Sequence, residues 1–476
     1  MKKFPLHWQI LVALILAIVF GLVFKTHYVF NAKNIEKIAN RNVPEEVLDA
    51  VKSLDGMTFY DQSTLTQRMN ERLDHETVVK YKGLIFKQTY VNPAVKSISW
   101  MGDIFLRLLK MLILPLILFS IITAVSNIGS AENLGRLGLK TFTYYTGTSL
   151  LAIVTGLFFV NLIKPGVGAD LNFSEVLEGF NSEQKGLGQI LVEIVPENIF
   201  QALVTNEMLS VIFFAIIFGF FITRIEDKYK QNLNDLFNAG NDVIMKIVLF
   251  VIKFTPFGVF GIVSKVISEQ GNLIELAHRM GLYMLVVLAG LATHMFISLP
   301  LITRIIGKVR PFLHYKNMST PLLTAFSTSS SGATLPLTMH AIEEKSGISS
   351  KISSFTLPLG ATVNMDGTAL YECVAAMFIA QAYGIEMSII QQMIIIVTAL
   401  LASIGAAAIP MAGFIMITVI LTAVGLPLEG VGLILAVDRI LDMFRTTVNV
   451  WSDCCGAAVI AKTEGEILPI DIKKHI

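Results

Sequence analysis

The sequence predicts an all-α polytopic membrane protein. Hydrophobic residues make up 54% of the 476 residues and charged residues only 15%, too few to cover a soluble protein of this size. Several apolar runs are long enough to cross a bilayer of about 30 Å at about 1.5 Å per residue. The net charge of +1 gives no reason to expect nucleic acid as a partner. The long apolar runs are 8–24, 106–125, 281–302 and 389–424.

Residues 1–25 are expected to form the first transmembrane helix rather than a cleaved signal. Met1, Lys2 and Lys3 lead into a run of spanning length that no small-residue cleavage site follows. Residues 26–95 hold nine Lys/Arg and nine Asp/Glu. Because long loops cross the membrane regardless of charge, we expect 26–95 to be an extracytoplasmic inserted loop with some helix.

Basic segments separate the later spans and indicate the cytoplasmic side. The alternate connections, 165–185 and 268–276, carry few basic residues. This alternation predicts about eight spans with both termini in the cytoplasm, in a multi-pass protein of the cell (inner) membrane. The basic segments contain Arg136 and Lys140, Arg224 to Lys230, Arg304 to Arg310, Lys345 and Lys351, and Lys462.

Four stretches in the last third interrupt the apolar pattern with small or polar residues. Backbone groups freed by such breaks at membrane depth need protein, water or a ligand as partners. We therefore expect a polar binding site built from discontinuous helices and re-entrant hairpins. The stretches are AFSTSSSGATLPLT (325–338), NMDGT (364–368), SIGAAAIPMAG (403–413) and LDMFRTTVNVWSD (441–453).

The last of these stretches carries a polar stripe on one helix face, because its members recur every three or four residues. Each ionised group costs roughly 2.5–3.5 kcal/mol at the membrane centre, so the stripe must face an interior site or partner helices. A ladder of structural ion pairs is the alternative to a ligand site. Arginine suits a carboxylate and aspartate suits an ammonium, which favours an acidic amino acid as ligand. The stripe comprises Asp438, Asp442, Arg445, Asn449 and Asp453.

NMDGT offers oxygen atoms suited to an alkali cation, from Asn364, Asp366 and the carbonyls freed where the helix breaks. Asn449 and Asp453 could join them, and a plain turn is the alternative. In the Ser/Thr/Gly tract, backbone N–H groups at a hairpin tip could hold a carboxylate as helix N-termini do. A flexible polar loop is the alternative there.

Together the four motifs resemble the dicarboxylate/amino acid:cation symporter family, the glutamate and aspartate transporters, in a bacterial-type member. The resemblance covers 1–25 and 96–465 and leaves 26–95 outside. It implies an elevator-type homotrimer in the lipid bilayer. Each protomer would have eight transmembrane helices and two re-entrant hairpins, near 312–342 and 388–424. The motifs are SSSGATLP (329–336), NMDGTALYE (364–372), AAIPMAG (407–413) and LDMFRTTVNVWSD (441–453).

The same resemblance implies a division of the chain. Residues 1–25 would be the first transmembrane helix of the scaffold, followed by the insert 26–95. Residues 96–310 would hold scaffold helices together with transport-domain helices 3 and 6. Residues 311–465 would form the transport core of hairpin 1, helix 7, hairpin 2 and helix 8. Residues 466–476 would be a cytoplasmic tail.

The resemblance also implies site residues. Asp442 would bind the substrate's amino group and Arg445 its side-chain carboxylate. The implied substrate-binding set is Ser331, Thr368, Ile409, Gly413, Asp442, Arg445, Thr446 and Asn449. One implied sodium site has Gly360, Asn364, Asn449 and Asp453. A second has Tyr145, Thr148, Ser149, Asn364 and Asp366. A third has carbonyls of Ser403, Ile404 and Ala406, with Thr362 and Met365.

Several positions depart from the family pattern or stand outside it. Ser329 and Met443 occupy the two places where other members carry an arginine, so Arg439, one turn before Asp442, is the candidate charge partner of Asp442. Glu372 matches a glutamate linked to proton transport and is the candidate proton carrier, and a plain hydrogen-bonded glutamate is the alternative. His294, alone in an apolar run, is expected to be a core histidine rather than a proton relay.

We therefore expect a secondary active symporter that imports an acidic amino acid with sodium and with Glu372 as an optional proton carrier. The trio Tyr145, Thr148 and Ser149 favours sodium. A proton-coupled glutamate or C4-dicarboxylate symporter is the alternative, and an anion-conducting channel is the alternative from another class. We do not expect an enzyme, because the arginine beside Asp438 and Asp442 would keep both ionised.

Overall fold

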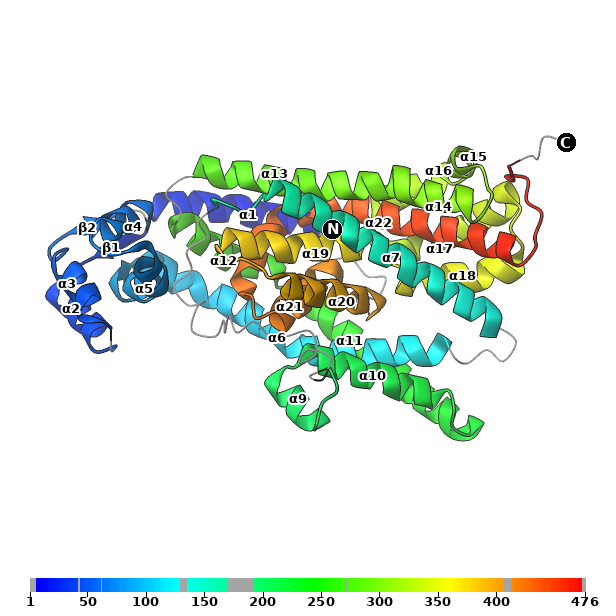
Figure 1. The fold of residues 1–476 in the computed structure, drawn as a ribbon, viewed down its shortest axis with the longest axis horizontal. Coiled ribbons are helices and arrows are strands. Elements are labelled where there is room, and N and C mark those ends of the chain that lie inside the picture. The colour runs from blue at the N-terminus through cyan, green and yellow to red at the C-terminus, as the bar shows by residue number, and fades with distance from the viewer. Residues whose placement is uncertain are drawn as a thin grey trace, which may run out of the picture.

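The computed structural model shows a nearly all-helical, elongated molecule (Figure 1). It describes residues 6–41, 43–60, 62–128, 135–169, 192, 194–269, 273–405 and 412–472. The helices outside 27–91, up to residue 305, are α1 (Leu6–Val23), α6 (Pro93–Ile128), α7 (Gly135–Ile163), α9 (Ile199–Thr205), α10 (Met208–Ile222), α11 (Asp227–Ile252), α12 (Thr255–Glu269), α13 (Leu273–Thr293), the π-helix η1 (His294–Ser298) and α14 (Leu299–Ile305). The later ones are α15 (Pro311–Asn317), α16 (Ser319–Thr328), α17 (Ser331–Ser346), α18 (Ser350–Val363), α19 (Asp366–Ala382), α20 (Ile389–Gly405), α21 (Ala412–Ala423), the 3-10 helix η2 (Leu428–Gly430) and α22 (Val431–Thr463).

Length and hydropathy identify three described helices that could cross a membrane, or four if the bent pair α11 and α12 counts as one span. The pair bends by 52°. Three further apolar helices are shorter. α22 is 33 residues long but carries the polar stripe, which lowers its hydropathy. The predicted number of eight spans stays a prediction.

Residues 27–91 form a small unit with its own hydrophobic cluster at one end of the molecule (Figure 1). Its sheet has the antiparallel order β2-β1-β3, with Tyr28 opposite both Phe59 and Tyr90. These short strands depart from the all-α prediction. The elements are β1 (His27–Val29), α2 (Ala32–Ala39), α3 (Glu45–Lys52), β2 (Thr58–Phe59), α4 (Gln62–Asn70), α5 (His75–Thr89) and β3 (Tyr90–Val91).

The unit is fastened to the membrane helices where its chain enters and leaves. Asn92 Nδ2 donates hydrogen bonds to Phe24 O at 2.8 Å and to Thr26 Oγ1 at 3.1 Å. The Thr26 hydroxyl lies 3.0 Å from that of Ser268, at the end of α12. The entry and exit of the unit therefore lie side by side.

One bundle consists of five helices, in which α1 packs on α12, α12 packs on α6, and α10 and α11 both pack on α6. Small residues bring α12 and α6 close together. A Cβ at Gly261 would lie 2.6 Å from the backbone nitrogen of Gly102. Such close backbone approach stabilises helix pairs through van der Waals contact.

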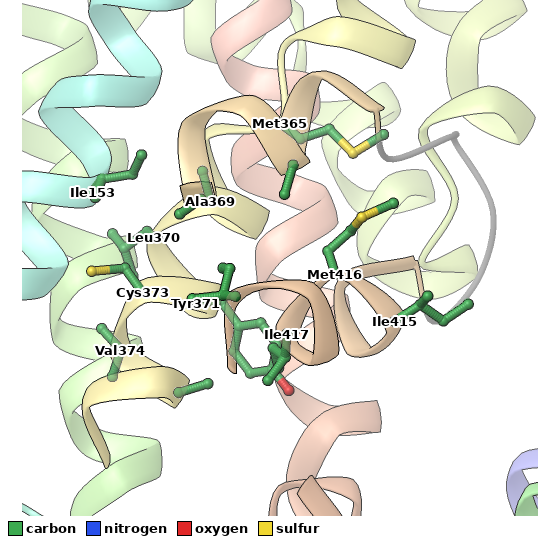
Figure 2. Close-up of a cluster of buried hydrophobic side chains, with 14 of the residues drawn as sticks. Ile153, Met365, Ala369, Leu370, Tyr371, Cys373, Val374, Ile415, Met416 and Ile417 are labelled. Carbon is green, nitrogen blue, oxygen red and sulfur yellow. The ribbon is translucent and has the colours of Figure 1, made fainter. Parts of the chain in front are cut away.

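A second group of helices surrounds α19, which is buried along its length and packs on α7, α13, α21 and α22. In Figure 2, Tyr371 of α19 and Met365, just before that helix, lie on the side of Met416 and Ile417 of α21, with Ile153 of α7 on the other flank. α16 pairs with α17 and α20 pairs with α21 as two helical hairpins. These hairpins, and the break between α18 and α19, bring polar groups to α22.

Candidate functional site

The stripe predicted on α22 is buried. The five side chains belong to residues between 1% and 8% exposed. Their partners outside α22 lie on α19 and at Asn364, the residue after α18. Charged groups removed from water in this way need hydrogen-bond or ion-pair partners. The partners of each stripe residue therefore define the site.

Arg445 lies at the centre of one polar cluster. Its Nη2 donates a hydrogen bond to Asp442 Oδ1 at 2.7 Å and lies 3.3 Å from Asp438 Oδ1. The guanidinium carbon lies 3.9 Å from the centre of the Tyr371 ring, and the Tyr371 hydroxyl donates to Asp438 at 2.7 Å. Stacking and ion pairing together fix the plane of the guanidinium.

Part of this guanidinium has no partner among the described residues. Nε and Nη1 of Arg445 are buried without a hydrogen bond. A Cβ at Gly413, at the start of α21, would lie 2.6 Å from Nη1, so only a glycine lets α21 approach the guanidinium this closely. The unpaired N–H groups could hold a carboxylate in the bidentate manner of arginine.

The carboxylate of Asp442 can also accept a further hydrogen bond. Its Oδ2 accepts no hydrogen bond within the described ranges, and Arg439 Nη1 lies 3.7 Å from it. The Arg439 side chain is 42% exposed, so this contact is weak. Arg439, the predicted charge partner of Asp442, thus lies within ion-pair distance of it.

Ser329 lies at the tip between α16 and α17 and adopts φ +50°. Its hydroxyl is buried and forms no hydrogen bond with a described group.

Asn449 docks the beginning of α19 onto α22. Its Oδ1 accepts from the backbone nitrogen of Gly367 at 2.7 Å, and its Nδ2 donates to Thr368 Oγ1 at 3.1 Å. Thr446 and Ser331 are also buried, at 5% and 7% exposure. The described members of the predicted substrate set thus lie on α17, α19, α21 and α22. Ile409 lies outside the described residues.

A second polar cluster surrounds Asp366, the fully buried first residue of α19. Its Oδ1 accepts from Ser149 Oγ at 2.6 Å and from Thr148 Oγ1 at 3.3 Å, both on α7. Its Oδ2 accepts from Ser452 Oγ at 2.6 Å and lies 2.9 Å from His294 Nε2. Three hydroxyl groups and one imidazole, from α7, α22 and η1, therefore surround one carboxylate.

Asn364 links this cluster to Asp453. Its Nδ2 donates to Asp453 Oδ1 at 2.9 Å, while Thr148 Oγ1 lies 3.5 Å from its Oδ1. The Tyr145 hydroxyl donates to the carbonyl of Thr356 at 2.7 Å. A Cβ at Gly360 would overlap Asp453 Oδ1 and lie 2.7 Å from the Tyr145 hydroxyl. These contacts bring together Tyr145, Thr148, Ser149, Gly360, Asn364, Asp366 and Asp453 of the first two predicted sodium groupings, while Asn449 contacts Gly367 and Thr368.

The third predicted sodium grouping lies partly outside the described residues and stays a prediction. Thr362 is exposed, and its hydroxyl bonds back to Leu359 O at 3.0 Å. Ser403 Oγ bonds to Leu400 O at 2.8 Å, and Met365 is buried. Ile404 lies in the last turn of α20, and Ala406 is outside the described residues. No group of three or more His, Cys, Asp or Glu that could hold a metal occurs in the described ranges.

Two groups in these clusters were not predicted to take part. His294 begins the π-helix η1, where a widened turn leaves Met295 O to accept from Trp451 Nε1 at 3.1 Å. π-turns recur at functional sites, and a lone histidine in an apolar run was the only signal. Ser452, next to Asp453 on α22, gave no signal in the sequence.

Glu372 is a buried carboxyl without a partner. It is 0% exposed on α19, and neither oxygen is hydrogen-bonded to any described group. An ionised carboxylate in such surroundings is costly.

Comparison with known proteins agrees with this geometry. The model of the sodium:dicarboxylate symporter family matches residues 6–463. The chain belongs to the sodium:dicarboxylate symporter family. Two relatives illustrate its range. Excitatory amino acid transporter 3 of Mus musculus is 37% identical over 428 residues, 79% of this chain and 81% of that protein. The proton/sodium-glutamate symport protein of Bacillus caldotenax is 36% identical over 392 residues, 81% of this chain and 91% of that protein. The symporter family and these relatives are transporters rather than enzymes.

Proposed function

We propose that the chain is a secondary active symporter that imports an acidic amino acid, aspartate or glutamate, together with sodium. The observation that carries this proposal is Arg445, whose Nε and Nη1 are buried and unpaired in the described structure. They suit a side-chain carboxylate, and Asp442 Oδ2 beside them suits an ammonium. The names of the two relatives, a glutamate symport protein and an amino acid transporter, support the same class of substrate.

Sodium coupling is supported by the oxygen-rich contacts around Asp366 and Asp453. Tyr145, Thr148 and Ser149 supply neutral oxygens beside them, which suits an alkali cation carried as co-substrate. Glu372 is our candidate for a proton carried alongside sodium. A membrane potential of 100 mV contributes about 2.3 kcal/mol for each net charge moved inward, so excess cations would drive uptake.

We further propose the architecture that the family resemblance implies. The protomer would have eight spans and two re-entrant hairpins, and three protomers would form an elevator-type homotrimer in the cell membrane with both termini cytoplasmic. Residues 311–465 would move as the transport core against scaffold helices, with α20 and α21 as the gate. The buried polar stripe, which cannot face lipid, supports a site inside the core.

The test is uptake of labelled L-aspartate into proteoliposomes at fixed pH, under an inward sodium gradient or an equal choline gradient. We expect uptake with sodium only. Equal uptake under both gradients, with acidification of the lumen, would favour proton coupling through Glu372. No uptake under either would contradict an acidic amino acid as substrate.

The same proteoliposomes distinguish the proposed symport from two other functions, C4-dicarboxylate transport and an anion channel. A C4-dicarboxylate has no ammonium for Asp442, so succinate should not compete with aspartate. An anion channel shows no exchange of internal for external substrate, so counterflow of labelled aspartate against unlabelled aspartate would exclude a simple channel.

A further inference from the structure

The chain after α22 folds back as a strap, residues 464–472, at the end of the molecule opposite the 27–91 unit (Figure 1). The reversal occurs at Gly465, whose φ of +92° favours glycine. Glu466 N bonds to Ala461 O at 3.0 Å and closes the helix end. Leu468 and Ile470 are 4% and 1% exposed, so the strap is anchored in the hydrophobic core.

The strap holds the chain where it enters the first hairpin. Val309 and Asp471 form an antiparallel bridge. Arg310 N donates to Ile470 O at 2.8 Å, and Ile472 N donates to Lys308 O at 3.0 Å. The Arg310 side chain adds a bond from Nη2 to Pro469 O at 2.9 Å. α15 begins at the next residue, so its start is fixed to the strap.

The strap also holds the chain where it leaves the first hairpin. The carboxylate of Glu466 accepts from both the backbone nitrogen, at 3.2 Å, and the hydroxyl of Ser349, the residue before α18. Gly347 has φ +72°, and a Cβ there would lie 2.6 Å from Pro469 Cδ. Entry and exit are thus fixed to one short segment.

The same strap reaches α7. Glu464 accepts from Lys140 Nζ and from Arg136 Nη2, each at 2.6 Å, and these bonds hold its pKa below the ordinary value. Lys462 Nζ bonds to Asp471 Oδ2 at 2.6 Å and closes the strap upon α22. Exposed ion pairs of this kind contribute little singly, but here they accompany two buried apolar anchors.

We propose that the strap is a clamp that holds the first hairpin, α15 to α17, against α22 as a fixed wall of the binding site throughout transport. The hairpin packs on α22 through α16 and α17, so any hinge motion at its base must break the contacts of Arg310 and Ser349. Glu466, Leu468 and Ile470 are positioning residues, since none lies in the polar clusters. The inference rests on the proposed transport function.

The first experiment locks the clamp with a disulfide between Val309→Cys and Asp471→Cys, which face each other across the bridge. The native cysteines, Cys373, Cys454 and Cys455, are buried and do not compete. We expect sodium-driven aspartate uptake to stay within about twofold on oxidation. A loss of about tenfold or more that reductant restores would overturn the proposal, because the strap would then have to open in each cycle. The two single-cysteine proteins are the controls.

The second experiment releases the clamp by Ile470→Asp and measures labelling of Thr338→Cys by a membrane-impermeant thiol reagent. Thr338 lies on α17 and is 3% exposed. We expect labelling to become about tenfold faster when the hairpin loosens. The control is Ile467→Asp, at a strap residue that is already 91% exposed.

If Ile470→Asp does not fold, Glu466→Gln is the milder variant and should accelerate labelling in the same direction. Unchanged labelling in a folded, released protein would overturn the clamp. Because labelling needs no transport, a protein without uptake would contradict the proposed function and leave this test intact.

Discussion

Arg445 and Asp442 form a hydrogen bond with each other on α22. Nε and Nη1 of Arg445 and Oδ2 of Asp442 have no hydrogen-bond partner in the described structure. A buried ion pair gains little over apolar packing, and removing one partner leaves an uncompensated charge. The pair is better explained by ligand binding than by stability. An incoming ammonium and carboxylate could each complete one half of it.

Replacing Asp442 by alanine should abolish binding of aspartate, because the ammonium loses the carboxylate oxygen that has no hydrogen-bond donor in the described structure. We expect at least about a hundredfold weaker binding, or ~2.7 kcal/mol. Isothermal titration of the purified protein with aspartate in sodium measures the change. The control is Thr447→Val on the same helix, whose hydroxyl only bonds back to Met443 O. Unchanged affinity in Asp442→Ala would sink the assignment of the ammonium site.

Spacing alone was enough to place the five stripe residues on one face, because a helix fixes their direction. It could not reveal Tyr371 over Arg445, or Ser452 and His294 on Asp366, since those contacts join segments far apart in the sequence. The third sodium grouping stays a prediction, because Ala406 lies outside the described residues.

The break between α18 and α19 places the polar residues of NMDGT inside the core. Asn364 and Met365 leave helical geometry, and α19 restarts with Asp366 inside the core. The small residues of NMDGT predicted this break. Both hairpins also appear near their predicted ranges, as 311–346 and 389–423. The strands of 27–91 were missed because each has only two or three residues.

Gly367→Ala should separate α19 from α22. A Cβ there would lie 2.6 Å from Arg445 O and 3.1 Å from Asn449 Oδ1, and the first of these atoms is backbone. We expect a loss of about 1–3 kcal/mol in stability together with weaker aspartate and sodium binding. Thermal unfolding in detergent, with and without both ligands, measures this.

The control for this change is Gly281→Ala on α13, where a Cβ meets nothing within 4 Å. It should be neutral or slightly stabilising, since alanine favours helix over glycine. A Gly367→Ala protein that melts and binds like Gly281→Ala would contradict the close docking of α19 on α22.

The whole molecule combines a membrane part with a unit, 27–91, that has a separate hydrophobic cluster. Composition predicted the membrane class, and the motifs predicted the family. The number of spans could not be settled by hydropathy, because helices such as α22 hold charges inward and others are short. Length and charge marked 26–95 as an insert but gave no sign of the packed interior of 27–91.

Excising 27–91 and joining Thr26 to Asn92 through a short glycine-serine linker should leave transport working. The two ends already bond to each other at 3.1 Å, and the unit's cluster is separate from the membrane core. We expect sodium-driven uptake within about threefold of the full chain. Uptake in proteoliposomes, with size-exclusion chromatography as the control for folding, measures it. A folded but inactive deletion would show that transport depends on the unit.

The π-turn at His294–Ser298 has a consequence for how such a site can be gained or lost. A π-turn amounts to one extra residue in an otherwise regular helix. Removing one codon there would restore an ordinary turn and rotate His294 by about 100° relative to the helix that follows. A single-step insertion or deletion would thus connect or disconnect an imidazole from Asp366, without any substitution among the residues that contact it.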